Sequence, residues 1–299
     1  EVVAEGRFDQ EVIRRDPLDG SARRPTLRRI ATAAAPAVGR QEIAPSMTPP
    51  PAPPPLLVVA HGDGGADPRD ETVRRLAEVL ARRLDRPVDW ATLKRPDTFA
   101  EARARLAAAL DRADADPLGP VVVYPLFMAE GLFVRVRLPK LLAEHGFAET
   151  RMLPVFGLDP GLVDLVEHRL RSIASMQGGL EPKDLRIALI AHGSASGDPG
   201  SRLAAEAIAV PLRVRLAADV RLGFVEEAPV FDRLIAEARP DVVVGLFVSA
   251  GTHALDDVAA AVAADRRVRH HVDAIGRDAG VADLVERALA GISVPTSGV

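Results

Sequence analysis

The sequence predicts an α/β protein made of two similar doubly wound parallel-sheet lobes, related by internal duplication. Short runs of valine, leucine and isoleucine alternate with amphipathic helical segments, which is typical of parallel strands buried on both faces. A run that ends in Ala-His-Gly at residues 56–62 returns at 187–193. A second run at 125–133 returns at 245–253. Repetition of both runs in the same order indicates two copies of one layered fold.

Each copy shows four strand patterns with helical patterns between them. The predicted strands cover 56–60, 88–92, 121–127 and 151–155, then 186–191, 220–225, 242–248 and 268–274. The predicted helices cover 69–83, 98–112, 134–145 and 161–174, then 201–216, 230–238, 254–264 and 279–290.

The chain divides into three predicted segments. Residues 1–55 are rich in arginine and end in a proline run, so we expect a disordered N-terminal extension there, with a docking tail as the alternative. Met47 is a candidate initiator within it. An N-terminal lobe is expected at 56–176 and a C-terminal lobe at 177–299, because Gly178, Gly179 and Pro182 are typical of a linker.

Composition limits the classes of function. The net charge of -4 gives no general attraction to nucleic acid or to an anionic membrane. No apolar run reaches the roughly 20 residues of a membrane span. The chain has no cysteine, so a metal would have to bind through His, Asp or Glu. We expect a cytoplasmic protein with no nucleic-acid or membrane partner, either a monomer or a homodimer.

Three potential metal ligands follow strands of the second lobe. His192 comes directly after the strand at 186–191, Glu226 after the strand at 220–225, and His253 after the strand at 242–248. Ligands of open parallel sheets bind beyond the carboxyl ends of the strands, so these side chains are expected at one rim. Two imidazoles and a carboxylate suit a divalent first-row metal. Glu227 is the weaker candidate because alternation along a strand turns it the other way.

Other interpretations of these residues stay open. The glycine-rich segment 192–199 matches neither the dinucleotide fingerprint nor a Walker loop. Ser194 beside His192 suggests a hydrolase only loosely, since the nucleophile elbow G-x-S-x-G is absent. The apolar residues near 127–133 are, from their type and place at the end of a strand, ordinary core.

The ordered motifs resemble those of the class II tetrapyrrole chelatases, the sirohydrochlorin cobaltochelatase and ferrochelatase family. Ala-His-Gly-Ser at 191–194, Phe-Val-Glu-Glu-Ala-Pro at 224–229 and the run at 246–253, with Asp256 and Asp257, carry the resemblance. It extends over about residues 56–290 and both lobes.

The resemblance implies insertion of cobalt(II) or iron(II), with nickel(II) also possible, into sirohydrochlorin or a related tetrapyrrole, in cobalamin or siroheme biosynthesis. No cofactor beyond the substrate metal is implied. His192, Glu226 and His253 would bind the metal and take up pyrrole protons. The first lobe keeps His61, but Asp63 replaces Ser194, Leu93 stands near the position of Glu226, and Phe133 replaces His253. We therefore expect a degenerate site there.

The first lobe would instead contribute to the substrate site. The expected substrate-binding residues are His61, Phe127, Met128, Leu132, Phe133 and Ser194. Arg135 and Arg137 would suit the carboxylates of sirohydrochlorin. A non-catalytic metal or tetrapyrrole carrier or scaffold of the same fold is the main alternative, and a hydrolase that uses Ser194 is the third.

Overall fold

A computed structural model of the chain describes residues 52–63, 70–111, 118–249 and 253–292, without the side chains of 253–255. Residues 1–51 of the predicted N-terminal extension lie outside the described residues. The predicted lobe boundary at 176–177 stays a prediction. Within the described ranges, every helix is too short or too polar to serve as a membrane span.

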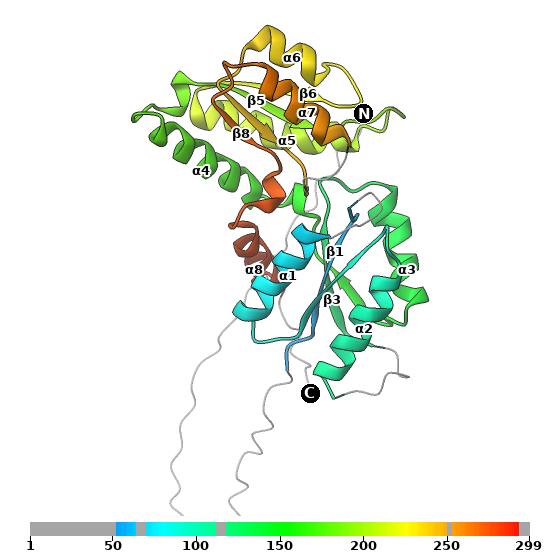
Figure 1. Cartoon of the computed structure of the whole chain (residues 1–299). Coiled ribbons are helices and arrows are strands. Elements are labelled where there is room, and N and C mark those ends of the chain that lie inside the picture. The colour runs from blue at the N-terminus through cyan, green and yellow to red at the C-terminus, as the bar shows by residue number, and fades with distance from the viewer. Residues whose placement is uncertain (1–51, 64–69, 112–117, 250–252, 293–299) are drawn as a thin grey trace, which may run out of the picture. The chain divides into compact units, whose positions relative to one another are not determined.

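The strands form two four-stranded sheets in which all neighbours are parallel (Figure 1), so the predicted fold class is confirmed. The orders β2-β1-β3-β4 and β6-β5-β7-β8 are the same arrangement repeated. All eight predicted strands are present, with ends that differ by a few residues. The first sheet contains β1 (Leu56–Ala60), β2 (Val88–Thr92), β3 (Val121–Leu126) and β4 (Thr150–Met152). The second contains β5 (Arg186–Ala191), β6 (Asp219–Phe224), β7 (Val242–Gly245) and β8 (His270–Val272).

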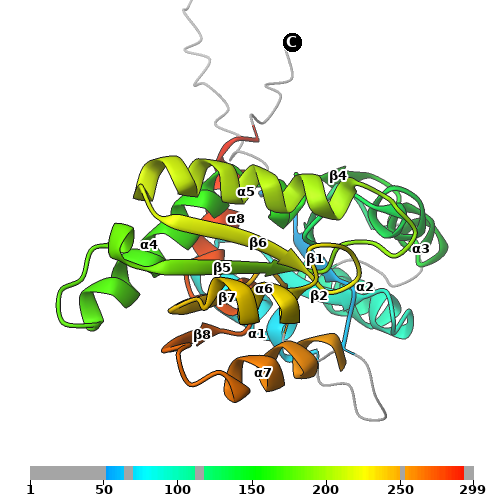
Figure 2. The same cartoon turned by 90° about the horizontal axis from the view of Figure 1, so that it is seen from above.

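One face of each sheet is covered by helices from its own half of the sequence. Apolar residues of α2 and α3 pack on the first sheet, and those of α6 and α7 pack on the second. Figure 2 shows α6 and α7 on one side of the second sheet and α5 on the other. The helices are α1 (Glu71–Arg83), α2 (Asp97–Ala109), α3 (Leu138–Glu144), α4 (Gly161–Met176), α5 (Gly200–Leu216), α6 (Phe231–Ala238), α7 (His253–Ala264) and α8 (Val281–Ala290).

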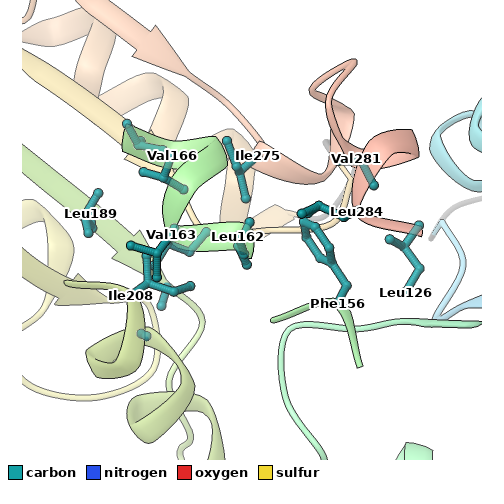
Figure 3. Packing of buried hydrophobic residues seen from close by; sticks show 14 of the residues in the cluster. Leu126, Phe156, Leu162, Val163, Val166, Leu189, Ile208, Ile275, Val281 and Leu284 are labelled. Atoms are coloured by element: carbon teal, nitrogen blue, oxygen red, sulfur yellow. The ribbon is translucent and has the colours of Figure 1, made fainter. Parts of the chain in front are cut away.

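The other face of each sheet is covered partly by a helix from the opposite half. Helix α4 packs beside α5, where Val163 and Val166 join Leu189 and Ile208 in one apolar cluster (Figure 3). Helix α8 packs beside α1 in the first half, and its Leu284 belongs to the same cluster. The two halves therefore exchange their last helices and share one continuous core.

The predicted helix at 134–145 is two elements. Residues Phe133–Arg137 form a π-helix, η1, and α3 follows from Leu138. A π-helix inserts an extra residue into the helical repeat and is frequently found at functional sites. Here it follows the loop after β3, which borders the cavity described below.

A glycine in each half is pressed against the loop that follows the third strand. Gly157, in the 3-10 turn η2 (Phe156–Leu158), donates its N–H to the Phe127 carbonyl at 2.9 Å. Gly276, in the turn η4 (Ile275–Arg277), makes the same hydrogen bond to Phe247 at 2.9 Å. A Cβ atom on either glycine would overlap the carbonyl oxygen of Met128 or of Val248. Both loops are thus held in place by the same close backbone approach.

Candidate active site

A cavity of about 460 Å³ lies at the carboxyl ends of the strands. It is bordered by the loops after β1 and β3 of the first sheet and by those after β5 and β7 of the second. In each sheet the strand order reverses between the two strands of a neighbouring pair, β1 and β3 in the first sheet and β5 and β7 in the second. Doubly wound proteins bind ligands at this point of the sheet. The cavity lining is mainly apolar, with a few polar groups from the two histidine loops.

His192 lines the second half of the cavity and pairs with Glu226. Nδ1 of His192 lies 3.5 Å from Oε2 of Glu226, and both side chains are about half exposed. The backbone fixes their relation, because the Glu226 N–H donates to the His192 carbonyl at 2.9 Å. The Ala195 N–H also donates to Glu226 Oε2, at 3.2 Å. An accessible imidazole and carboxylate are thus held together at one rim.

Glu227 turns away from this pair, as the strand alternation predicts. Its carboxylate accepts hydrogen bonds from Nη2 and Nε of Arg202, at 2.8 and 3.1 Å. The Arg202 guanidinium lies over the Phe224 ring, 4.3 Å from its centroid. A Cβ atom on Gly193, whose φ is +75°, would lie 2.7 Å from Cγ of Glu227. Glu227 therefore packs against Gly193, in the loop that carries His192.

The third predicted ligand, His253, is the first residue of α7, and its side chain lies outside the described part. Among the described side chains, no group of three His, Asp or Glu residues is arranged as a metal site. Of the three predicted ligands, the structure therefore brings two together, and the position of the third imidazole stays a prediction.

His61 also borders the cavity, as its place after β1 predicts. The Phe133 ring meets the His61 ring edge to face, with centroids 4.8 Å apart. Burial of the imidazole lowers its pKa below the ordinary value of 6.5, and the charges of Lys94, Arg137 and His192 lower it further. His61 is thereby favoured in its neutral form.

The residue that matches Glu226 in the first half is Lys94, not Leu93. Strand register pairs Ala60 with Thr92 and Ala191 with Phe224, and Lys94 and Glu226 each stand two residues further on. The Lys94 N–H donates to the His61 carbonyl at 3.0 Å, as the Glu226 N–H does to that of His192. Leu93, predicted to stand near this position, is the residue directly before the match, and the strand register is needed to tell the two apart.

The apolar residues expected to bind substrate differ in exposure. Phe127, Met128, Leu132 and Phe133 all border the cavity. Phe127 also belongs to the first-sheet core and is only 7% exposed, whereas Leu132 is 71% and Phe133 42% exposed. Leu132 and Phe133 therefore present apolar surface that no described element covers, while Phe127 anchors the loop.

Ser194 also borders the cavity, but its hydroxyl is used within its own loop. Its Oγ lies 2.9 Å from Oγ of Ser196 and accepts from the Asp198 N–H at 3.2 Å. Nδ1 of His192 faces Glu226 instead. Within the described residues, the geometry gives the hydrolase hypothesis no nucleophile–base pair.

Sequence reasoning missed two polar residues that shape the histidine loops. Buried Asp70 accepts from the Asp63 N–H at 2.8 Å, and Ser201 accepts from the Gly193 N–H at 3.0 Å. Each stands nine residues after the histidine of its half. Comparison of the two copies could have identified these residues by their equal spacing from the histidine, although one is an aspartate and the other a serine.

Comparisons with known proteins agree with the fold. The family model for CbiX matches residues 55–173. The chain is 31% identical to a solved structure described as CbiX, the terminal enzyme for biosynthesis of siroheme in denitrifying bacteria. That match has a TM-score of 0.63 and covers 80% of this chain and 99% of the other. SirB from Bacillus subtilis with Fe3+ shares the fold at 17% identity, with a TM-score of 0.59 over 79% of this chain and 94% of that one. Among curated protein sequences, none matches.

Two four-stranded parallel sheets in one chain, with a cavity at their carboxyl ends, define the fold of a class II chelatase. The chain belongs to the CbiX family of these proteins, the family of sirohydrochlorin chelatases.

Proposed function

We propose that this protein inserts cobalt(II) or iron(II) into sirohydrochlorin or a closely related tetrapyrrole, with one active site on the second half of the cavity. The observation that carries the proposal is the His192–Glu226 pair, 3.5 Å apart and accessible beside an apolar cavity of about 460 Å³. Imidazole and carboxylate are suitable ligands for both metals. We assign metal binding to His192, Glu226 and His253.

The internal repeat supports the role of His253. Phe133 and His253 each stand six residues beyond the phenylalanine whose carbonyl accepts the glycine N–H, Phe127 or Phe247. In the first half, the Phe133 ring packs against His61. An imidazole in the matching place of the second half would approach His192, which completes a ligand set of two histidines and one glutamate.

This ligand set accounts for the chemistry of metal insertion. The metal ion replaces two protons on the inner nitrogens of the macrocycle, so the reaction releases two protons for each metal bound. Glu226 offsets the charge of the incoming ion and is a proton acceptor, and the neutral form of an imidazole binds the ion or accepts a proton. Because the site is open on one side, the ion can exchange protein ligands for pyrrole nitrogens. The reaction needs no redox cofactor.

The macrocycle has a suitable surface on the first half. Leu132 and Phe133 present exposed apolar groups beside the cavity, and Met128 lines it. A flat conjugated ring buries apolar area against such side chains, which favours binding by roughly 25 cal/mol for each Å² removed from water. We therefore place one face of the tetrapyrrole on this loop and its centre toward His192, with Ser194 at its edge.

The proposal is tested by following the absorbance of anaerobic sirohydrochlorin with cobalt(II) or iron(II), with and without the protein. We expect protein-dependent conversion over many turnovers, and the faster metal indicates the pathway that the protein serves. His253→Ala should abolish insertion but leave tetrapyrrole binding in place, whereas His168→Ala, a change of an exposed histidine on α4, should have no effect.

Two results would contradict the proposal. Tetrapyrrole binding without insertion for either metal would favour the carrier alternative. Full activity of both His192→Ala and His253→Ala would show that the metal site lies elsewhere.

A further inference from the structure

The residues bonded to the two cavity histidines carry opposite charge at matching positions. Lys94 and Glu226 occupy the same register beyond the second strand of each sheet, and each donates its backbone N–H to the carbonyl of the cavity histidine of its half. An ammonium group in the first half thus replaces the carboxylate that accompanies His192 in the second. This reversal changes the charge that an ion beside the histidine would experience.

A second cation reinforces the reversal. Nη2 of Arg137, the last residue of the π-helix, donates to the carbonyl of Leu93 at 3.1 Å, so its guanidinium lies beside the backbone of Lys94. Arg95 is different, because it pairs with buried Asp70 at 3.3 Å. Within the part of the chain that the structure describes, no carboxylate pairs with the ammonium of Lys94 or the guanidinium of Arg137.

Metal binding at this place is disfavoured for two reasons. The ring of Phe133 packs on His61, and Phe133 stands at the sequence position that His253 holds in the second repeat. The charges of Lys94 and Arg137 favour the neutral imidazole and would repel a divalent cation. The same charges attract an anion, and Arg and Lys side chains are the usual partners of carboxylates.

We propose that the place beside His61 in the first half, flanked by Lys94 and Arg137, binds a peripheral carboxylate of the tetrapyrrole and not a metal ion. This inference rests on the proposed function, since it requires the macrocycle to occupy the cavity. The duplicated site has then kept its position at the sheet edge and changed its ligand from a cation to an anion. One half holds the metal, and the other fixes the orientation of the macrocycle over it.

The test measures binding of uroporphyrin, a metal-free tetrapyrrole whose side chains end in carboxylates, by fluorescence quenching. Lys94→Met should raise the dissociation constant about three- to tenfold, the loss expected for one partly exposed charge pair, and Lys94→Glu should raise it further. Lys140→Met removes the same charge from an exposed position on α3 and serves as the matched control. The methyl ester of uroporphyrin should bind Lys94→Met and the unchanged protein equally.

The outcomes separate this inference from the proposed function. If the unchanged protein binds no uroporphyrin and inserts no metal into sirohydrochlorin, the proposed function fails and this inference fails with it. If it binds uroporphyrin but Lys94→Met and Lys140→Met have the same dissociation constant, only the carboxylate site is wrong.

Equilibrium dialysis with cobalt(II) tests whether the place beside His61 binds a metal ion. His61→Ala should leave the number of bound ions per chain unchanged, while His192→Ala should reduce it. A loss of bound cobalt in His61→Ala would overturn the inference.

Discussion

Nδ1 of His192 faces Oε2 of Glu226 across 3.5 Å, and the backbone N–H of Glu226 donates to the carbonyl of His192. The loop that carries the carboxylate is therefore joined by a backbone hydrogen bond to the loop that carries the imidazole. A neutral residue of the same shape at position 226 would keep the loop and remove the charge.

We accordingly expect Glu226→Gln to lower the rate of metal insertion by about 10²–10⁴-fold, the range for loss of a positioned proton acceptor. Stopped-flow absorbance with sirohydrochlorin and cobalt(II) measures this rate. Glu206→Gln removes a carboxylate from α5 that pairs with Arg202 at 3.8 Å, and it is the matched control. Equal rates in the two variants would remove Glu226 from the mechanism.

The glycines beneath the cavity loops predict a loss of stability. Alanine at position 157 or 276 would place a methyl group against a backbone carbonyl, which cannot move as a flexible side chain can. We expect Gly157→Ala and Gly276→Ala each to lower the free energy of unfolding by about 1–3 kcal/mol, the usual cost of overpacking. Urea denaturation followed by circular dichroism gives this value.

A control for these variants is Gly131→Ala, because a Cβ atom at Gly131 would meet nothing within 4 Å. Its free energy of unfolding should change by no more than about 0.5 kcal/mol. A similar loss in all three variants would mean that the close approach to Met128 and Val248 is not the cause.

The exposed apolar loop predicts a change in binding without a change in stability. Leu132 is surrounded mainly by solvent, so Leu132→Ser should leave the urea midpoint unaltered. If the macrocycle lies on this loop, the same change should raise the uroporphyrin dissociation constant about three- to thirtyfold, as expected for loss of one apolar contact. Leu203→Ser on α5, where the leucine is 58% exposed, should alter neither quantity.

The lowered pKa of His61 predicts how stability depends on pH. In the unfolded chain, His61 regains its ordinary pKa of 6.5, so the unfolded state binds a proton more tightly than the folded state does. The free energy of unfolding should therefore decrease as pH falls below about 6.5, until His61 is protonated in the folded protein as well. Burial lowers the pKa of His271 in the same direction.

Replacing each histidine with glutamine separates the two contributions. Urea denaturation between pH 8 and pH 5 should show a weaker decrease in stability for His61→Gln, and a weaker one still for the double variant with His271→Gln. An unchanged pH profile in the double variant would show that neither imidazole is held neutral by the fold.

Much of the fold was predictable because the inner strands of both sheets, β1, β3, β5 and β7, are dense apolar runs that each end in a loop. The strand positions, the duplication and the proximity of His192 to Glu226 all follow from that pattern and from the parallel order. The correspondence of Lys94 with Glu226 was not visible, because the two copies differ in sequence at this point and only the strand register shows which residues match.

The π-helix and the exchange of α4 and α8 between the halves also could not be predicted from the sequence pattern. The apolar periodicity at 134–145 is similar for a π-turn followed by an α-helix and for one continuous α-helix. The apolar face of α4 likewise suits either sheet, since both present valine and leucine. A further repeat, not used in the sequence analysis, lies in the connecting segments, where Gly-x-Asp-x-Gly occurs at 157–161 and again at 276–280. It indicates that both turns have the same structure and does not indicate which sheet the next helix covers.

The placement of α4 and α8 has a consequence for the origin of the molecule. A fragment that ended at Met176 would carry α4 without the sheet that α4 covers, and it would lack α8, which helps to cover its own sheet. Two such fragments could satisfy both needs by trading helices, as domain-swapped dimers do. The present chain has the form of such a dimer fused end to end. In a single chain the two copies of the site need not be identical, and position 94 holds a lysine where position 226 holds a glutamate.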